Sequence, residues 1–325
     1  MKRTIAMTGT TGFIGPHVME RLLADGHELS CLVRPGKAYV PVPGVRYCTG
    51  TLDDPASLKP LLEGAQTVVH LAALTRARTE AEFQAVNCDS VERLIDMAKA
   101  VSPAFDHIVA MSSLAAVGPS CDCRGVCEDE PPRPLTPYGR SKAALEAMLR
   151  RRQGEVSWTA LRAPAVYGPG DRDFLEYFKL VLKGWRFVVG KRNVMSLVYA
   201  KNLADAVALC VDAPAARNEA FFVADEGCYD WDDIGTMIER ALGTKARRVR
   251  VPFWGVWLAS LFSSALAPFC RKPPLLNKHK LAEMSQEFWV VSTDKAAKAL
   301  GYVPRWATGE AFRITAEWYR ENGWL

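Results

Sequence analysis

The sequence predicts an α/β protein with a doubly wound parallel sheet and a smaller C-terminal substrate-binding lobe. Short β-branched or apolar segments alternate with helical patterns through the first half of the chain. A glycine-rich turn, Thr8–Gly15, follows the first apolar segment and leads into a helical one. Tyr138 and Lys142 share one face of a later helical segment, and Tyr138 follows Ser113 by 25 residues.

The expected elements alternate along the chain. Strands are assigned to short runs of β-branched and apolar residues, and helices to segments whose apolar residues recur every three or four positions. The strands are Thr4–Thr8, Glu28–Arg34, Val45–Thr49, Thr67–Ala72, His107–Ser112 and Val156–Arg162. The helices are Pro16–Asp25, Pro55–Leu61, Glu82–Val101 and Pro137–Gln153. This order predicts helices on both faces of the sheet and ligands at the carboxyl ends of its strands.

Two lobes are expected. Residues 1–166 form a dinucleotide-binding domain of the Rossmann type, and residues 193–225 return to it through Met195–Tyr199 and Asn202–Val211. The less regular residues 167–192 and 226–325 form the substrate-binding lobe.

The composition fits a globular protein, with 49% hydrophobic and 24% charged residues. A formal net charge of +5 is too small and too dispersed to indicate nucleic-acid binding, so we expect none. The first residues lack the apolar segment of a signal peptide, which favours a cytoplasmic protein.

Nine scattered cysteines, an odd number, favour reduced thiols over a disulfide framework. Cys121, Cys123 and Cys127 are the one tight cluster. A closed zinc site needs a fourth ligand and usually a different spacing, so we expect a variable loop and no metal there.

The Thr8–Gly15 turn has the glycine spacing of a dinucleotide-binding loop. Gly9 permits the tight turn, Gly12 lets backbone N–H groups approach a pyrophosphate, and Gly15 allows close packing of helix on strand. The helix that follows favours phosphate at its N-terminus. The residues expected to surround the cofactor here are Thr11, Phe13 and Ile14 together with the three glycines.

Arg34 stands at the end of the second strand, where an acidic residue would bind the ribose diol of NAD. A guanidinium suits a 2′-phosphate, so the sequence favours NADP(H). If Arg34 only stacks on adenine, NAD(H) remains usable.

The Tyr138–Lys142 pair suggests acid–base chemistry. An ammonium group beside a phenol lowers the pKa of the phenol below its ordinary value of about 10. Such a tyrosine can give a proton to a ketone or take one from an alcohol. The alternative is a solvated pair on a helix surface.

Together these residues resemble the extended short-chain dehydrogenase/reductase family, over nearly the whole chain. Further matching segments are His70-Leu71-Ala72-Ala73, Asn87, Ser112-Ser113, Leu161–Gly170 and Lys298–Pro304. The resemblance implies that Tyr138 is the general acid/base and that Lys142 lowers its pKa and holds the nicotinamide ribose. It also implies that Ser113 binds the reacting oxygen.

The same resemblance implies further cofactor contacts. These come from Leu71, Ala72, Ala73, Asn87, Pro164 and Val166. Near the adenine, where the family usually has an acidic residue, this chain has Thr51 followed by Leu52.

The substrate is expected to be hydrophobic. Relatives that act on nucleotide sugars usually have Asn at the position of Ala165 and Arg at that of Met195, and a pyrophosphate would lose both anchors here. The C-terminal third resembles the 3β-hydroxysteroid dehydrogenase and dihydroflavonol reductase branch. A substrate pocket is expected from Phe253, Trp254, Trp257, Leu258 and Phe262, with plain core packing as the alternative.

Residues 253–270 are uncharged and flanked by basic residues. Serines, a glycine and Pro268 argue against a membrane-spanning helix. A buried helix of the substrate lobe is one interpretation, and a helix in peripheral contact with a membrane surface is another.

The sequence therefore predicts an NAD(P)-dependent oxidoreductase that interconverts a secondary alcohol and a ketone on a hydrophobic, for example sterol-like, substrate. The alternatives are a nucleotide-sugar epimerase or dehydratase with a transient keto intermediate, and a non-catalytic cofactor-binding protein. A homodimer through the helices Glu82–Val101 and Pro137–Gln153 is expected from the resemblance.

Overall fold

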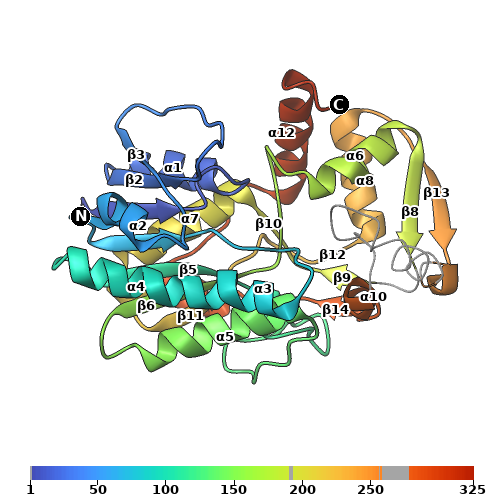
Figure 1. The fold of residues 1–325 in the computed structure, drawn as a ribbon. Coiled ribbons are helices and arrows are strands. Elements are labelled where there is room, and N and C mark those ends of the chain that lie inside the picture. Colours follow the sequence, from blue (N-terminus) through green and yellow to red (C-terminus); the bar gives the residue numbers. More distant parts are fainter. Residues whose placement is uncertain (1, 190–192, 256, 258–277) are drawn as a thin grey trace.

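The protein was analysed as a computed structural model that describes residues 2–189, 193–255, 257 and 278–325. Its centre is a parallel sheet of seven strands, the six that were predicted and β11, in the order β11-β6-β5-β4-β1-β2-β3 (Figure 1). The strands are β1 (Thr4–Thr8), β2 (Glu28–Val33), β3 (Val45–Thr49), β4 (Thr67–His70), β5 (His107–Ser113), β6 (Ser157–Ala163) and β11 (Glu219–Phe222). Chain order reverses between β1 and β4, which is where ligands bind in such sheets.

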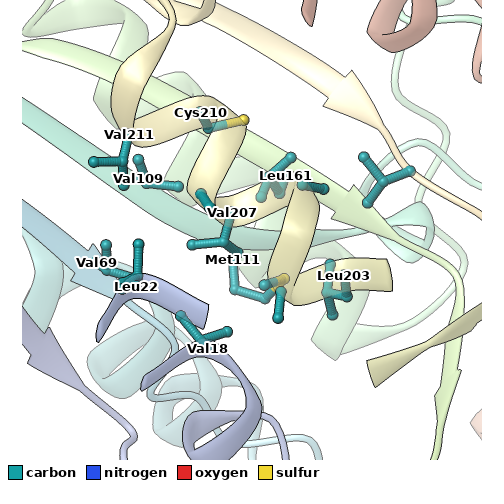
Figure 2. Packing of buried hydrophobic residues seen from close by; sticks show 14 of the residues in the cluster. Val18, Leu22, Val69, Val109, Met111, Leu161, Leu203, Val207, Cys210 and Val211 are labelled. Carbon is teal, nitrogen blue, oxygen red and sulfur yellow. The ribbon is translucent and has the colours of Figure 1, made fainter. Parts of the chain in front are cut away.

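Helices cover both faces of the sheet. On one face lie α1 (Gly15–Ala24) and α7 (Ala200–Asp212); on the other lie α2 (Pro55–Leu62), α4 (Ser90–Val101) and α5 (Pro137–Arg151). Strand β1 shows why two cores form: Ile5 and Met7 point into one, and Ala6 points into the other. Figure 2 shows the first core, in which Leu203 and Val207 of α7 pack over Val109 and Met111 of β5.

The long helix expected over Glu82–Val101 is three shorter segments. A short helix α3 (Glu80–Gln84) leads into one π-helical turn, Ala85–Asp89, and then into α4. The extra residue of a π turn rotates the side chains that follow, and such turns are common at functional sites. Here the turn carries Asn87.

The remaining elements form a third core. It is built by α6 (Asp173–Leu182), α8 (Trp231–Leu242) and α12 (Thr308–Glu321) around Phe178, Ile234 and Phe312. The small strands are β7 (Ala165–Tyr167), β8 (Trp185–Val189), β9 (Val194–Met195), β10 (Leu197–Tyr199), β12 (Tyr229–Asp230), β13 (Arg247–Val251) and β14 (Phe288–Trp289). They make a β10-β7 pair, a β12-β9-β14 sheet and a β13-β8 pair.

The C-terminal residues pack into two different hydrophobic cores. Helix α11 (Asp294–Leu300) brings Ala296 and Leu300 into the core of the large sheet, together with Tyr302, while α12 packs into the third core. The division into a dinucleotide-binding domain (1–166 and 193–225) and a substrate-binding lobe (167–192 and 226–325) stays a prediction.

In the part of the chain that the structure describes, no helix has both the length and the apolar character to cross a membrane. Most of the segment 253–270 lies outside the described residues.

Candidate active site

The glycine-rich loop closes against the loop after β4. Gly9 has a φ of 78°, and a Cβ there would lie 2.6 Å from the backbone nitrogen of Ala72. A Cβ on Gly15 would lie 2.5 Å from the carbonyl oxygen of Thr10. No side chain therefore fits at either position, and the backbone itself forms the cradle.

The N-terminus of α1 opens into this cradle. No acidic residue lies in its first turn, so nothing there competes for the positive end of the helix dipole. The His17 ring nitrogen Nε2 lies 2.9 Å from the carbonyl oxygen of Pro169, which ties α1 to the loop after β7. A free helix N-terminus behind a side-chain-free loop fits a dinucleotide pyrophosphate.

The residues assigned to the adenosine end follow β2 and β3. Arg34 is exposed directly after β2, the strand beside β1. After β3, the Thr51 backbone N–H donates to Ser57 Oγ at 3.1 Å, and Leu52 packs against the second sheet core. Arg34, Thr51 and Leu52 therefore lie on the same carboxyl edge of the sheet as the glycine loop.

Ser113, Tyr138 and Lys142 meet where β5 ends and α5 begins. Thr136 caps α5 by accepting the Gly139 N–H at 3.1 Å, which fixes the turn that carries Tyr138. The hydroxyl groups of Ser113 and Tyr138 are hydrogen-bonded to one another. Lys142 is fully buried, and its Nζ donates to the carbonyl oxygen of Met111 at 2.6 Å.

The electrostatics of this group differ from the expectation. Burial raises the pKa of Tyr138, Glu283 adds to the rise, and only the hydrogen bond with Ser113 opposes it. Burial also lowers the pKa of Lys142 to about 8, against the opposing charge of Glu146. The expected depression of the tyrosine pKa by Lys142 is not observed, because desolvation dominates for both groups.

Asn87 joins the β4 loop to α5. Its side-chain carbonyl accepts the Leu74 N–H at 2.8 Å, and its amide donates to Leu74 O at 2.9 Å and Ser141 Oγ at 3.0 Å. Ser141 in turn donates to the carbonyl oxygen of Tyr138 at 2.8 Å. Both amide protons are used within the protein, so the side chain sets the spacing between loop and helix.

A buried ion pair behind the site was not expected. Arg162 on β6 and Glu146 on α5 are each at most 2% exposed, and Arg162 Nη2 lies 2.7 Å from Glu146 Oε2. Ser112 Oγ donates to the same carboxylate at 2.6 Å. The sequence did offer a signal for this pair. Arg162 interrupts the apolar strand β6, and Glu146 interrupts the buried side of the amphipathic helix α5.

Two further acidic residues also escaped the sequence analysis. Glu283 on α10 (Lys278–Met284) acts electrostatically on Tyr138 although it is far away in the chain. Asp225 is buried and accepts hydrogen bonds from Tyr167 Oη at 2.9 Å and Asn202 Nδ2 at 2.7 Å. Neither belongs to a motif that marks it: Asp225 ends an apolar run, and Glu283 stands in a helix among residues of mixed polarity.

The residues after β6 occupy a separate small strand. Pro164 links β6 to β7, where Val166 pairs in register with Val198 of β10. Ala165 is exposed, and Met195 packs against the third core.

The expected aromatic pocket is not observed for the two tryptophans. Trp254 is 67% exposed and Trp257 is 49% exposed, so they neither enclose a pocket nor belong to the core. Leu258 and Phe262 lie outside the described residues, and Phe253 is partly buried.

One group of potential metal ligands occurs among the described residues, at Asp25, His27 and Asp212. His27 Nδ1 accepts the Arg3 backbone N–H at 3.1 Å. The neutral ring therefore carries its proton on Nε2, which has no lone pair for a metal. Cys121, Cys123 and Cys127 are exposed free thiols.

Comparison with known proteins agrees with this geometry. Residues 5–224 match the NAD dependent epimerase/dehydratase family. A ceramide reductase of Caulobacter vibrioides is 30% identical over 99% of this chain and 96% of that protein. A 4-hydroxy-2-methyl-3-oxo-4-farnesyl-3,4-dihydroquinoline-1-oxide ketoreductase of Stigmatella aurantiaca is 27% identical over 92% of this chain and 91% of that protein.

Solved structures agree on the fold. The UDP-glucose 4-epimerase of Thermus thermophilus, in complex with NAD, superposes with a TM-score of 0.77 over 98% of this chain and 99% of that chain, at 23% identity. The family match covers the sheet, the glycine loop and the Ser113–Tyr138–Lys142 group. The chain is therefore an oxidoreductase of the NAD-dependent epimerase/dehydratase family, within the extended short-chain dehydrogenases/reductases.

Proposed function

We propose that this protein reduces a ketone on a lipid-type substrate to the secondary alcohol, with Tyr138 as the proton donor. The observation that carries the proposal is the hydrogen-bonded Ser113–Tyr138 pair beside buried Lys142, on the sheet edge that holds the glycine loop. The bound nicotinamide cofactor supplies the hydride.

The residues have distinct tasks in this scheme. Ser113 orients the substrate oxygen, and Tyr138 donates its proton to that oxygen as negative charge develops. A raised pKa keeps Tyr138 protonated at neutral pH, which is the form that ketone reduction needs. Lys142 holds the cofactor ribose and, when protonated, stabilises the tyrosinate left behind.

The lipid-type substrate is supported by two observations. The positions where nucleotide-sugar enzymes usually place Asn and Arg are Ala165 and Met195, and neither can bind a pyrophosphate. Two relatives of this chain, the ceramide reductase and the 4-hydroxy-2-methyl-3-oxo-4-farnesyl-3,4-dihydroquinoline-1-oxide ketoreductase, have names that specify a ceramide and a farnesylated ketone.

We also propose that NADP(H) is preferred to NAD(H). Arg34 is exposed at the end of β2, and no hydrogen bond or ion pair holds its guanidinium to another described residue. A guanidinium in that position suits a ribose 2′-phosphate.

The test is an absorbance assay with NADPH and NADH. The substrates are 3-keto-ceramide, a 3-keto-sterol and a UDP-sugar. We expect oxidation of the cofactor with a ketolipid and none with the UDP-sugar. Tyr138→Phe should bind the cofactor as wild type does and lose turnover by roughly 10²–10⁴-fold.

Two results would contradict the proposal. Near wild-type turnover by Tyr138→Phe would remove the assigned proton donor. Interconversion of UDP-sugars without net cofactor consumption would establish the epimerase alternative.

A further inference from the structure

An aromatic face lies on the small β8-β13 sheet. Trp185 of β8 pairs in parallel register with Arg247 of β13, and Phe187 pairs with Val249. Side chains paired in register project to the same side of a sheet, and alternate residues share that side. Trp185, Phe187, Arg247 and Val249 therefore form one face.

The opposite side of the same sheet is already covered. Arg186 donates to Thr236 Oγ1 of α8 at 2.7 Å, and Arg248 lies 2.9 Å from Asp232 at the start of α8. The first face instead points away from α8. Trp185 is 44% exposed and Phe187 is 36% exposed, which is unusual for side chains of this size.

Further exposed apolar side chains flank the two strands in the sequence. Trp254 and Trp257 follow β13 directly and are strongly exposed, and Leu180 and Leu182 precede β8. These four, with Trp185 and Phe187, are six of the nine exposed large hydrophobic side chains among the described residues. Such concentration marks an interaction surface.

The charge around the face has one sign. Lys183 and Lys245 stand before the two strands, and Arg247 lies on the face itself within β13; all three are exposed. Within residues 180–189 and 243–255, the chain carries no acidic residue at all. The nearby carboxylates of α8, Asp232 and Glu239, face Arg186 on the covered side.

We infer that this aromatic face, with its basic rim, is the surface by which the protein binds an anionic lipid bilayer. Tryptophan side chains sit favourably at the level of lipid headgroups, and lysine and arginine are attracted to anionic ones. The inference rests on the proposed function, in which the ketone is held in a membrane lipid.

The test is cosedimentation of the full chain with vesicles. Vesicles of phosphatidylcholine alone are compared with vesicles that also contain phosphatidylglycerol. We expect binding to the anionic vesicles that weakens as salt is raised. Trp185→Ser with Phe187→Ser should abolish it, and Arg247→Ala should lower the partition coefficient about fivefold, the equivalent of about 1 kcal/mol.

A matched control uses the other exposed apolar pair. Tyr39 and Val40 are exposed on the β2–β3 connection, and Tyr39→Ser with Val40→Ser should bind vesicles as wild type does. Circular dichroism checks that each variant is folded.

The outcomes separate the two proposals. Absence of binding to anionic vesicles by a folded chain overturns the membrane surface. A second result would also overturn it. If the wild-type chain is a dimer in light scattering, does not bind vesicles, and becomes a monomer in the Trp185→Ser with Phe187→Ser variant, the face is a dimer interface. Vesicle binding together with no ketolipid reduction would leave the membrane surface standing and defeat the proposed function.

Discussion

At the residue scale, burial shifts the pKa values of both Tyr138 and Lys142 in the direction that favours the neutral side chain. Burial raises the pKa of the phenol and lowers the pKa of the ammonium, and both effects oppose the tyrosinate–ammonium pair that the sequence analysis predicts. The pair is thus set for proton donation by the tyrosine. The lysine titrates closest to the physiological range.

Activity should depend on the protonation of Lys142. Ketone reduction is expected to fall as pH rises through about 8, where the Lys142 ammonium loses its proton. Glu146→Gln removes a carboxylate that favours the charged lysine, so the alkaline limb of kcat/KM should move to lower pH. Glu321→Gln, at an exposed position, is the control. An unmoved limb in folded Glu146→Gln would contradict the coupling.

The free energy of unfolding should also depend on pH through the pKa of Lys142. The folded protein binds the Lys142 proton less tightly than the unfolded chain, whose lysine has its ordinary pKa of 10.5. The contribution of this side chain to the free energy of unfolding therefore rises with pH between about 8 and 10.5. Lys142→Met should lack that slope in urea denaturation across this range. Parallel slopes for both proteins would refute it.

Cofactor preference should depend on Arg34. A charge-assisted hydrogen bond to a 2′-phosphate contributes about 1.5–3 kcal/mol, so Arg34→Ala should weaken NADPH binding roughly tenfold or more and leave NADH binding little changed. Fluorescence titration of both cofactors measures the ratio. Arg46→Ala is the control, because Arg46 bonds Ser30 on the neighbouring strand. Equal losses for both cofactors would count against a 2′-phosphate contact.

At the element scale, the glycine loop and the β4 loop are one unit. Gly9 and Gly26 both have positive φ, but only at Gly9 would a Cβ meet backbone, at Ala72. Gly26→Ala should cost about 1–2 kcal/mol of stability from the left-handed backbone alone.

Gly9→Ala should cost more than Gly26→Ala and should also weaken cofactor binding, because the two loops must separate. Urea denaturation and cofactor titration measure the two effects. Equal costs for the two variants would show that the loops do not press on one another at this position.

The elements that the sequence could predict are those with a local signal. The central strands appear as short apolar runs, and α5 begins at Thr136-Pro137, a cap followed by a first-turn proline. The π turn around Asn87 could not be predicted, because its sequence is that of an ordinary helix. The two-residue strands β9 and β14 could not either, since their pairing depends on residues about a hundred positions apart.

The candidate site divides in the same way. Ser113, Tyr138, Lys142 and the glycine loop were predicted from motifs with fixed spacing. Glu283 and Asp225 were not, because a single carboxylate outside any motif gives no sign of burial or of a distant partner.

At the scale of the whole molecule, Asp225 joins segments from far apart in the chain. Its carboxylate accepts hydrogen bonds from Tyr167 of β7, from the backbone N–H of Tyr199 and from Asn202 of α7. Burial raises the pKa of Asp225 in spite of these three donors. These hydrogen bonds to Asp225 therefore hold the small β7-β10 pair against the large sheet.

Removing the Asp225 carboxylate should lower the free energy of unfolding. Asp225→Ala removes the shorter-range acceptor of the buried Tyr167 hydroxyl and of the Asn202 amide, which keep only the carbonyl oxygens of Thr308 and Trp306, and the loss should cost about 1–3 kcal/mol. Urea denaturation should show the loss, and Asp53→Ala, whose side chain is 78% exposed, should show little. A cost near that of Asp53→Ala would mean that water or a neighbour replaces the carboxylate.

The return of Ala296, Leu300 and Tyr302 to the sheet core has a consequence for biosynthesis. The glycine loop and all seven strands of the sheet leave the ribosome before the residues that cover part of one face of that sheet. Until residues 294–302 have been synthesised, we expect the nascent chain to expose an apolar part of that core, which is the kind of surface that chaperones bind. We expect a chain that ends before residue 294 to leave this part of the core uncovered, even though its glycine loop is intact.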